Sequence, residues 1–333
     1  MEQINNTDSK NIDISVIIPA YNAENTLHQC LSGLAAQTIP AERYEVILVD
    51  DGSTDQTRKI AEQFDVTYIF QKNQGPAAAR NRGVESARGS IILFTDSDCI
   101  PLPAWIEEMT GPFSDPDVIA VKGAYITNQK SPTARFAQVE FEERYNLLLN
   151  NDYIDMIDTY SAAFRKPVFL SFGGFDPSFP VANNEDTDLS YKMSTLGKKM
   201  VFNPNAIVEH LNHPACLKRY ATLKFSRGYW RMIVYKRYPD KMMKDSYTPQ
   251  TLKLQILFLF MALLCLFSAV LMWKIFWYPF FLFFLLFCLV SLPFILLAIQ
   301  KDFITGMTSP FFIAIRAASL GLGACWGIVS RTR

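Results

Sequence analysis

The chain has 333 residues, of which half are hydrophobic and 19% are charged, and its 32 basic residues balance its 32 acidic ones. This balance gives no reason to expect binding to nucleic acid, and the hydrophobic content excludes a disordered chain. Only seven charged residues follow Gln250, so the composition also excludes a purely soluble protein.

The first 250 residues begin with a polar tail and continue as an alternation of two patterns. The tail, residues 1–12, does not resemble a signal peptide, so we expect the domain after it to be cytoplasmic. Short β-branched runs then alternate with helical stretches, which predicts βαβ units, a mostly parallel sheet and an α/β fold. The predicted strands are 14–18, 45–49, 66–70 and 90–95, and the predicted helices are 23–36, 55–64 and 76–87.

Polar residues follow the first two predicted strands, where ligands bind in such sheets. Tyr21 offers a flat face for stacking, whereas Asn22 is best interpreted as a residue near the N-cap of the next helix. Asp50 and Asp51 are adjacent carboxylates, which repel each other unless a hydrogen-bond donor or a cation meets them. A nucleobase imide or a ribose hydroxyl is one such donor, and a turn that caps the next helix is the alternative.

The third and fourth strand ends carry an arginine and a pair of aspartates. Gly75 and Pro76 open a helix with free backbone N–H groups, and Arg80 lies one turn further on. An anion site is one interpretation of this segment, and an exposed helix face is the favoured one. Asp96 and Asp98 follow an apolar strand, and carboxylates in that position favour a hard cation, Mg²⁺ or Mn²⁺.

An acidic cluster precedes a later amphipathic run, residues 189–196. Asp186 lies between Glu185 and Asp188, and like-charged neighbours raise the proton affinity of a carboxylate, as suits a general base. The alternative is a helix start whose acidic residues match the helix dipole. The sequence leaves both interpretations open.

The last part of the chain has the composition of a membrane protein. A basic juxtamembrane segment, 236–253, precedes an apolar region, 254–330, in which we expect helices at 254–273, 276–299 and 308–330. Arg316 lies in the third of these, where a central charge costs about 2.5–3.5 kcal/mol on insertion scales. That helix is therefore either spanning or re-entrant.

The juxtamembrane charges predict an orientation in the cell membrane. Ten Lys or Arg residues and two Asp residues occur between 218 and 253, which is the pattern of a cytoplasmic segment. We therefore expect a multi-pass protein with Lys274 on the far side and Lys301 back in the cytosol.

Six motifs stand in order and together resemble the inverting glycosyltransferases of family 2, which have the GT-A fold. We expect this domain to cover residues 13–235. The motifs are VIIPAYN (16–22), VDDGSTD (49–55), GPAAARNRG (75–83), FTDSD (94–98), GGFDPSF (173–179) and NNEDTDLSYKMSTLG (183–197). The resemblance implies transfer of a sugar from a nucleotide-sugar, most often a UDP-sugar, to a hydroxyl of a lipid-linked or envelope glycan.

The resemblance also implies a role for each matching donor-side position. Pro19, Tyr21 and Asp51 match the positions that hold the nucleobase, and Asp96 matches the one that contacts the ribose or the sugar. We place two further residues among the donor-side candidates, Asn22 and Arg80.

Three positions match the chemical machinery of the family. Asp98 falls where the family holds its divalent metal, and His210 falls where some relatives place a third metal or diphosphate ligand. Asp186 matches the catalytic base that accepts the proton of the acceptor hydroxyl.

The sequence departs from the family at two places. Residues 161–163, Ser-Ala-Ala, replace the Gly-x-Asn often found on the acceptor side, so acceptor contacts do not carry over. Residues 227–231 keep aromatic and basic side chains but not the Gln-x-x-Arg-Trp order of processive members. A single-addition enzyme is the favoured interpretation. The alternatives are a subunit of a processive polysaccharide synthase, a nucleotidyltransferase and a non-catalytic membrane scaffold.

Overall fold

The computed structural model describes residues 12–179, 184–271 and 273–330, and it divides into two compact units. The sheet unit comprises residues 1–125 and 157–210, and the helical unit comprises residues 126–156 and 211–333. Residues 1–11 of the expected N-terminal tail and Asn183 of the sixth motif lie outside the described residues. The unit boundary groups two segments from the expected catalytic domain, 126–156 and 211–235, with the apolar helices.

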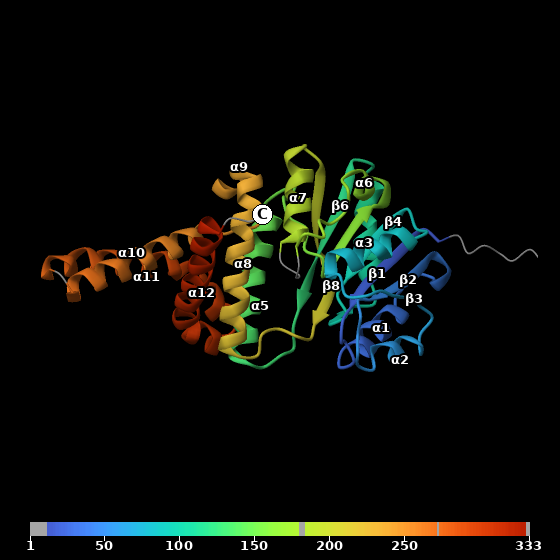
Figure 1. Ribbon diagram of the computed structural model, residues 1–333, viewed down its shortest axis with the longest axis horizontal. Helices are drawn as coiled ribbons and strands as arrows, with labels where there is room; N and C mark the ends of the chain where they lie inside the picture. The colour runs from blue at the N-terminus through green and yellow to red at the C-terminus, as the bar shows by residue number, and fades with distance from the viewer. Residues whose placement is uncertain (1–11, 180–183, 272, 331–333) are drawn as a thin grey trace, which may run out of the picture. The chain divides into compact units, whose positions relative to one another are not determined.

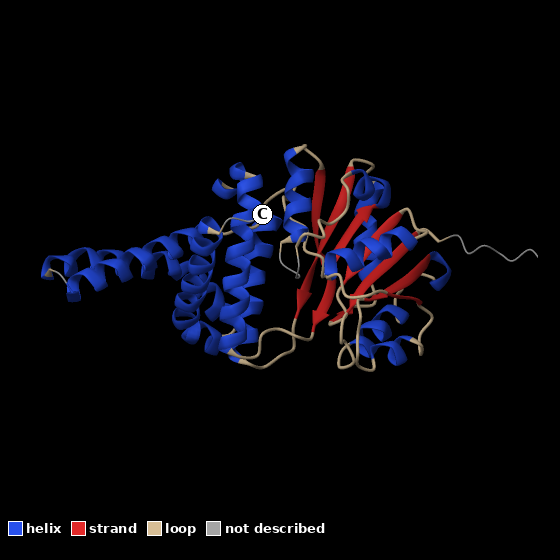
Figure 2. Cartoon of the chain, viewed as in Figure 1, coloured by secondary structure: helices blue, strands red, loops and turns tan. Residues whose placement is uncertain are grey.

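Within the described part of the sheet unit, eight strands form one mixed sheet in the order β3-β2-β1-β4-β7-β6-β8-β5 (Figures 1 and 2). The first four strands pair in parallel, as β1 with β2, β1 with β4, and β2 with β3. Strand β7 pairs antiparallel with both β4 and β6, and β5 pairs antiparallel with β8. The strands are β1 Ile14–Ala20, β2 Tyr44–Asp50, β3 Thr67–Phe70, β4 Ile91–Thr95, β5 Cys99–Pro101, β6 Val118–Ile126, β7 Ser161–Arg165 and β8 Lys199–His210.

The helices of the sheet unit complete an α/β fold. They are α1 Leu27–Ala35, α2 Thr57–Ala61, α3 Pro76–Ser86, α4 Trp105–Thr110, α6 Lys166–Ser171 and α7 Glu185–Thr195, with 3₁₀ turns at Ala41–Arg43 and Gly111–Ser114. Helix α3 approaches β1 closely, because a Cβ atom on Gly83 would lie 2.4 Å from Cγ2 of the fully buried Ile17. This contact holds α3, and with it Arg80, against the centre of the sheet.

Two predicted helices are shorter than the sequence indicates. Helix α1 begins at Leu27 and not at residue 23, and α2 covers only Thr57–Ala61. The reason is that the loops before them bind each other. The backbone N–H of Glu24 donates to Oδ2 of Asp55 at 3.1 Å, and the N–H of Gln56 donates to Oε2 of Glu24 at 3.1 Å.

The helical unit contains long apolar helices together with two that are strongly charged. Three helices are long and apolar enough to cross a membrane, with mean hydropathies of 2.6, 2.9 and 1.7 for Gln250–Leu271, Lys274–Lys301 and Phe303–Val329. These agree with the three expected apolar helices. In Figure 1, α12 lies side by side with α8, and the hairpin of α10 and α11 projects away from that pair. The helices are α5 Pro132–Leu149, α8 Leu217–Arg237, α9 Pro239–Met243, α10 Gln250–Leu271, α11 Trp277–Lys301 and α12 Phe303–Val329, with a 3₁₀ turn at Lys274–Phe276.

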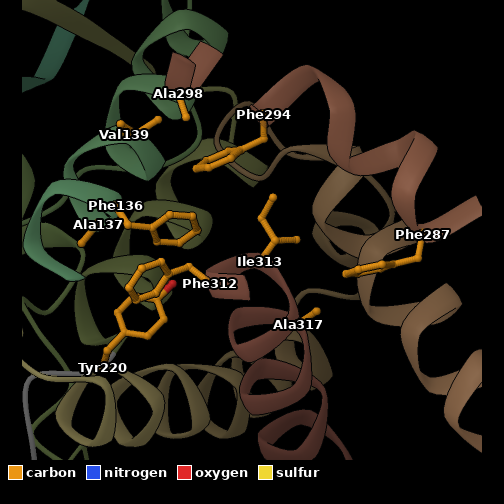
Figure 3. Packing of buried hydrophobic residues seen from close by; sticks show 10 residues of the cluster. All are labelled: Phe136, Ala137, Val139, Tyr220, Phe287, Phe294, Ala298, Phe312, Ile313 and Ala317. Atoms are coloured by element: carbon orange, nitrogen blue, oxygen red, sulfur yellow. The ribbon is translucent and has the colours of Figure 1, made fainter. Parts of the chain in front are cut away.

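The core of the helical unit is aromatic. Phe136 of α5 stacks on Phe312 of α12, with ring centroids 5.0 Å apart, and it lies 5.1 Å from the ring of Phe294 in α11. Figure 3 shows these rings around Ile313 and beside Tyr220 of α8. Burial of these side chains joins the charged helices to the apolar ones.

Candidate active site

The loop after β1 is shaped by Asn22, which has a left-handed backbone with φ of 50°. Its N–H donates to Oγ of Ser53 at 2.9 Å, and its Oδ1 accepts from the N–H of Thr54 at 2.9 Å. The N-cap of α1 is Thr26, so the interpretation of Asn22 as a residue near that N-cap is wrong. Tyr21, beside it, has 55% of its surface exposed and remains available for stacking.

The carboxylate of Asp51 organises the loop that leads into α3. It is buried and accepts three hydrogen bonds, from Nε2 of Gln71 at 2.7 Å, the N–H of Gln74 at 2.9 Å and the N–H of Gly75 at 2.8 Å. Gly75 has φ of 89°, a conformation that favours glycine, and this turn starts α3 at Pro76. Asp51 therefore joins the end of β2 to the start of the helix that carries Arg80.

Arg80 is buried between two carboxylates. Only 2% of its surface is exposed, so the favoured interpretation of this segment as an exposed helix face is wrong for Arg80. Its Nη1 donates to Oε1 of Glu185 at 2.9 Å, and its Nη2 donates to Oδ1 of Asp96 at 2.8 Å. The guanidinium also lies over the ring of Phe175, 5.9 Å from its centroid. One side chain thus links the end of β4 to the start of α7.

We expect Arg80→Met to destabilise the protein by about 3–5 kcal/mol, because it leaves two carboxylates without their buried cation. Arg82→Met on the same helix is the matched control. Arg82 pairs with Glu85 at the surface, where both side chains are more than half exposed, and such a pair contributes less than about 1 kcal/mol. Denaturant unfolding of the detergent-solubilised variants measures both losses, and equal losses would contradict the bridging role.

Asp186 lies in the first turn of α7 and is partly buried. Withdrawal from water, strengthened by the nearby carboxylates of Glu185 and Asp158, raises the pKa of Asp186 to about 7, although Arg80 opposes the rise. Its Oδ1 accepts a hydrogen bond from the N–H of Thr187 at 2.7 Å. A carboxylate with this pKa exchanges a proton near neutral pH, as a general base requires.

Asp158, one of the carboxylates that act on Asp186, pairs with a buried lysine that the sequence motifs do not include. Lys122 of β6 is fully buried and forms an ion pair with Asp158. Its ammonium also donates to the hydroxyl of Tyr160 at 2.9 Å. The sequence signal was present, because Lys122 interrupts an otherwise apolar strand, and charged side chains are seldom buried without a partner.

Asp98 and His210 lie together at the paired ends of β5 and β8. Cys99 pairs with His210 across the two strands, and Asp98 directly precedes Cys99. The ligand atoms of these three residues all lie within 4.8 Å of one another. Burial, with the charges of Asp98 and Asp96, raises the pKa of the Cys99 thiol well above its usual value, so the thiol stays protonated.

This cluster fits a divalent metal. A carboxylate oxygen and an imidazole nitrogen fit a divalent ion such as Mn²⁺, whereas the sulfur of Cys99 is a soft ligand that a hard ion does not favour. The ring of His210 also packs against that of Tyr125, tilted by 52° with centroids 5.3 Å apart, which restricts the orientation of the imidazole. Asp98 and His210 are therefore the residues that would hold the ion.

Comparison with known proteins identifies the domain and the fold. Residues 15–169 match the profile of Glycosyl transferase family 2. The chain therefore carries a family 2 glycosyltransferase domain. Over 116 residues it is 41% identical to Glycosyltransferase AglE of Haloferax volcanii, which covers 33% of this chain and 38% of that one. Over 239 residues it is 26% identical to the Pre-mycofactocin glycosyltransferase of Mycobacterium tuberculosis, which covers 69% of this chain and 49% of that one.

Solved structures confirm the GT-A fold that the family 2 resemblance implied. The mannosyltransferase PcManGT from Pyrobaculum calidifontis, solved in complex with GDP-Man and Mn²⁺, matches with a TM-score of 0.59 at 19% identity. The match covers 95% of this chain and 87% of that chain. The chain spans less than half the length of each of the two curated relatives.

Proposed function

We propose that the protein is a metal-dependent inverting glycosyltransferase that adds one sugar, from a nucleotide-sugar, to a hydroxyl of a lipid-linked or envelope glycan. The family 2 domain supports the reaction class. One observation carries the assignment of the site, namely the bridge from Asp96 through Arg80 to Glu185. It joins the strand end assigned to the donor to the helix that bears Asp186, so donor and base are held in one network.

On the donor side, we assign a UDP-sugar to the ends of β1, β2 and β4. The exposed ring of Tyr21 and the edge of Pro19 provide a surface for the base. Asp51 is assigned to its N–H, since a carboxylate has about four acceptor sites and three of those of Asp51 are occupied. Asp96 binds the ribose or the sugar. Asn22 acts by holding the loop in place, since its amide oxygen already binds Thr54. PcManGT, solved with GDP-Man and Mn²⁺, supports a nucleotide-sugar donor and makes GDP the alternative nucleotide.

The leaving group is the nucleoside diphosphate, which develops negative charge as the bond between the sugar and the phosphate oxygen breaks. Asp98 and His210 would hold a divalent ion, which would supply electrostatic stabilisation for that charge. Arg80 is already paired with two carboxylates, so it acts by positioning Asp96 and Glu185 and does not bind the diphosphate itself.

Asp186 is assigned to the acceptor. The acceptor oxygen attacks the anomeric carbon opposite the leaving group, and its proton passes to the Asp186 carboxylate as the new bond forms. One displacement of this kind inverts the anomeric configuration. A positioned base contributes about 10²–10⁴-fold to such a step.

The pH dependence of transfer reports on this base. Because the pKa of Asp186 is raised to about 7, the reactive carboxylate form predominates only above that pH. We expect kcat/KM for the acceptor to rise with pH and to level off above about 7, with a slope of one below it. The Asp186→Asn variant should lose this limb in its residual activity. A limb that persists unchanged in Asp186→Asn would assign the titration to another group.

The membrane helices support a lipid-linked acceptor at the surface of the cell membrane. We propose that the domain faces the cytoplasm, because the segment that joins it to the apolar helices is basic. With at most three helices long enough to cross, the described chain offers little from which to build a channel for a growing polymer. This favours single addition over a processive synthase.

Ligand-dependent stability tests the donor assignment. We expect UDP and UDP-sugars to raise the unfolding temperature of the purified protein when Mn²⁺ is present, since a ligand that binds only the folded state stabilises it. EDTA should remove the effect, and Asp51→Ala should weaken it. Stabilisation by nucleoside triphosphates but not by any nucleotide-sugar would favour a nucleotidyltransferase.

A further inference from the structure

Helix α12 is in backbone contact with α8. A Cβ atom on Gly323 would lie 2.0 Å from the carbonyl oxygen of Phe225, and one on Gly228 would lie 2.3 Å from that of Leu320. Gly327, one turn after Gly323, continues the same face. Figure 1 shows the two helices side by side. They must therefore occupy the same environment, whether lipid or water.

Helix α8 is too basic to cross a hydrocarbon layer. Its 21 residues include seven Lys or Arg and no acidic residue, and each charge near a bilayer centre costs about 2.5–3.5 kcal/mol. The basic residues are Lys218, Arg219, Lys224, Arg227, Arg231, Lys236 and Arg237. Because α12 lies against α8, α12 does not cross either, although its length and hydropathy would allow it.

Charged partners meet α12 at its start, its middle and its end. Asp302, at its N-cap, forms an ion pair with Arg135 of α5. Arg316, in its middle, donates to Glu140 of α5 at 3.3 Å, and the carbonyl of Gly327 accepts from Nζ of Lys236 at 2.8 Å. A spanning helix would meet such groups only near its ends, because the bilayer centre excludes them.

The network around Arg316 explains how an apolar helix tolerates this charge, for which the sequence alone predicts a high free-energy cost of membrane insertion. Arg316 and Glu140 are both buried, and Glu140 also pairs with Lys224 of α8 at 2.8 Å. A second guanidinium nitrogen of Arg316 donates to Oε1 of Gln255 in α10 at 2.8 Å. Arg316 thus connects α12 to α5, α8 and α10, and its charge faces protein. Its guanidinium lies over the ring of Phe294, 4.6 Å from the centroid, and Figure 3 shows this ring within the apolar cluster.

The opposite face of α12 is an exposed apolar stripe. Its residues recur at helical spacing and lie on one side of the helix, away from the glycines that meet α8. They are Phe303, Ile304, Met307 and Phe311 in the first part of the helix and Leu322, Trp326, Ile328 and Val329 in the last part. In Figure 1 this helix runs across the direction of the α10–α11 hairpin. When the α10–α11 hairpin crosses a membrane, α12 therefore lies along the surface of that membrane.

We propose that α12 lies flat in the membrane interface, with its apolar stripe in the boundary between headgroups and acyl chains, and that only α10 and α11 cross. The occupant of this surface is the lipid bilayer. A helix with one apolar face binds in this manner, and the basic ends of α8 beside it match the negative surface of the cytoplasmic leaflet. The last residue of α12, Val329, then lies on the same side as α8. This inference concerns membrane attachment and does not depend on the proposed activity.

Depth measurements along α12 distinguish a flat helix from a spanning one. The full-length protein is reconstituted in phospholipid vesicles, with the exposed thiols Cys216 and Cys325 replaced. A nitroxide is attached to single cysteines at Met307, Phe311, Leu322 and Trp326, and in a reference variant at Leu264, an exposed side chain in the middle of α10. Collision with oxygen and with a water-soluble nickel chelate then gives the depth of each label.

We expect the four labels on α12 to report one shallow depth and the reference at Leu264 to lie much deeper. A graded series, with the labels at Phe311 and Leu322 as deep as the reference, would overturn the proposal, as would four labels fully in water. A C-terminal tag gives a second readout that changes no residue. It should react with an impermeant reagent on the side of the catalytic domain, opposite to Lys274→Cys. A tag on the same side as Lys274→Cys would also overturn the proposal.

Discussion

Asp186→Asn is expected to lower the rate of sugar transfer by about 10²–10⁴-fold, because it preserves the shape of the side chain and removes the proton acceptor. Donor affinity should change little, since the donor is assigned to Tyr21, Asp51, Asp96 and Asp98. A loss confined to the transition state lowers kcat and kcat/KM together. Transfer rates and nucleoside diphosphate binding, measured on the same preparation, separate the two effects.

The matched control is Asp188→Asn, which makes the same change two residues further along α7. We expect this variant to keep most of its transfer activity. If Asp186→Asn transfers normally while Asp188→Asn does not, the base is Asp188 and the assignment to Asp186 is wrong.

Removal of the metal is expected to have an effect of similar size. EDTA should abolish transfer, and Mn²⁺ or Mg²⁺ should restore it, because the ion neutralises the departing diphosphate. Asp98→Ala should lose at least about 10²-fold in activity and should respond little to added Mn²⁺, since one of its two proposed ligands is gone. Activity as a function of Mn²⁺ concentration measures the apparent affinity in each variant.

Cys99→Ala tests whether the neighbouring thiol is a ligand. The thiol lies in the same cluster, but sulfur is a soft ligand that a hard ion such as Mn²⁺ does not favour, so we expect the variant to bind Mn²⁺ as the unmodified protein does. Full activity of Asp98→Ala in the presence of EDTA would exclude the metal site at this cluster.

The parallel half of the sheet could be predicted from the sequence, because a short stretch of neighbouring residues indicates each of its strands and helices. Four β-branched runs alternate with three helices, and the strands β1 to β4 formed close to the predicted positions. The antiparallel half of the sheet could not be predicted in this way. Helix α5 separates β6 from β7, and helices α6 and α7 separate β7 from β8. The contact of Cys99 with His210 joins residues 111 positions apart, a pairing that no periodicity predicts.

The environment of Arg80 shows why the candidate site was only partly predictable. The local sequence indicated an exposed helix, since nothing near Arg80 in the chain balances its charge. Its partner Glu185 lies 105 residues away, and burial of the pair depends on the packing of α3 against β1. The environment of Arg316 was equally hidden from the local sequence. The free-energy cost of its charge in an apolar helix could be predicted, but its partner Glu140 lies 176 residues away.

Product analysis tests the central claim, that this site transfers a sugar from a nucleotide-sugar with inversion. The purified protein is incubated with UDP- and GDP-sugars, Mn²⁺ and a lipid extract that contains lipid-linked acceptors. Chromatography identifies the released nucleotide, and NMR determines the anomeric configuration of the new linkage. We expect a nucleoside diphosphate and a linkage of opposite configuration to the donor, both lost in Asp186→Asn. Release of pyrophosphate, or retention of the donor's configuration, would contradict the account.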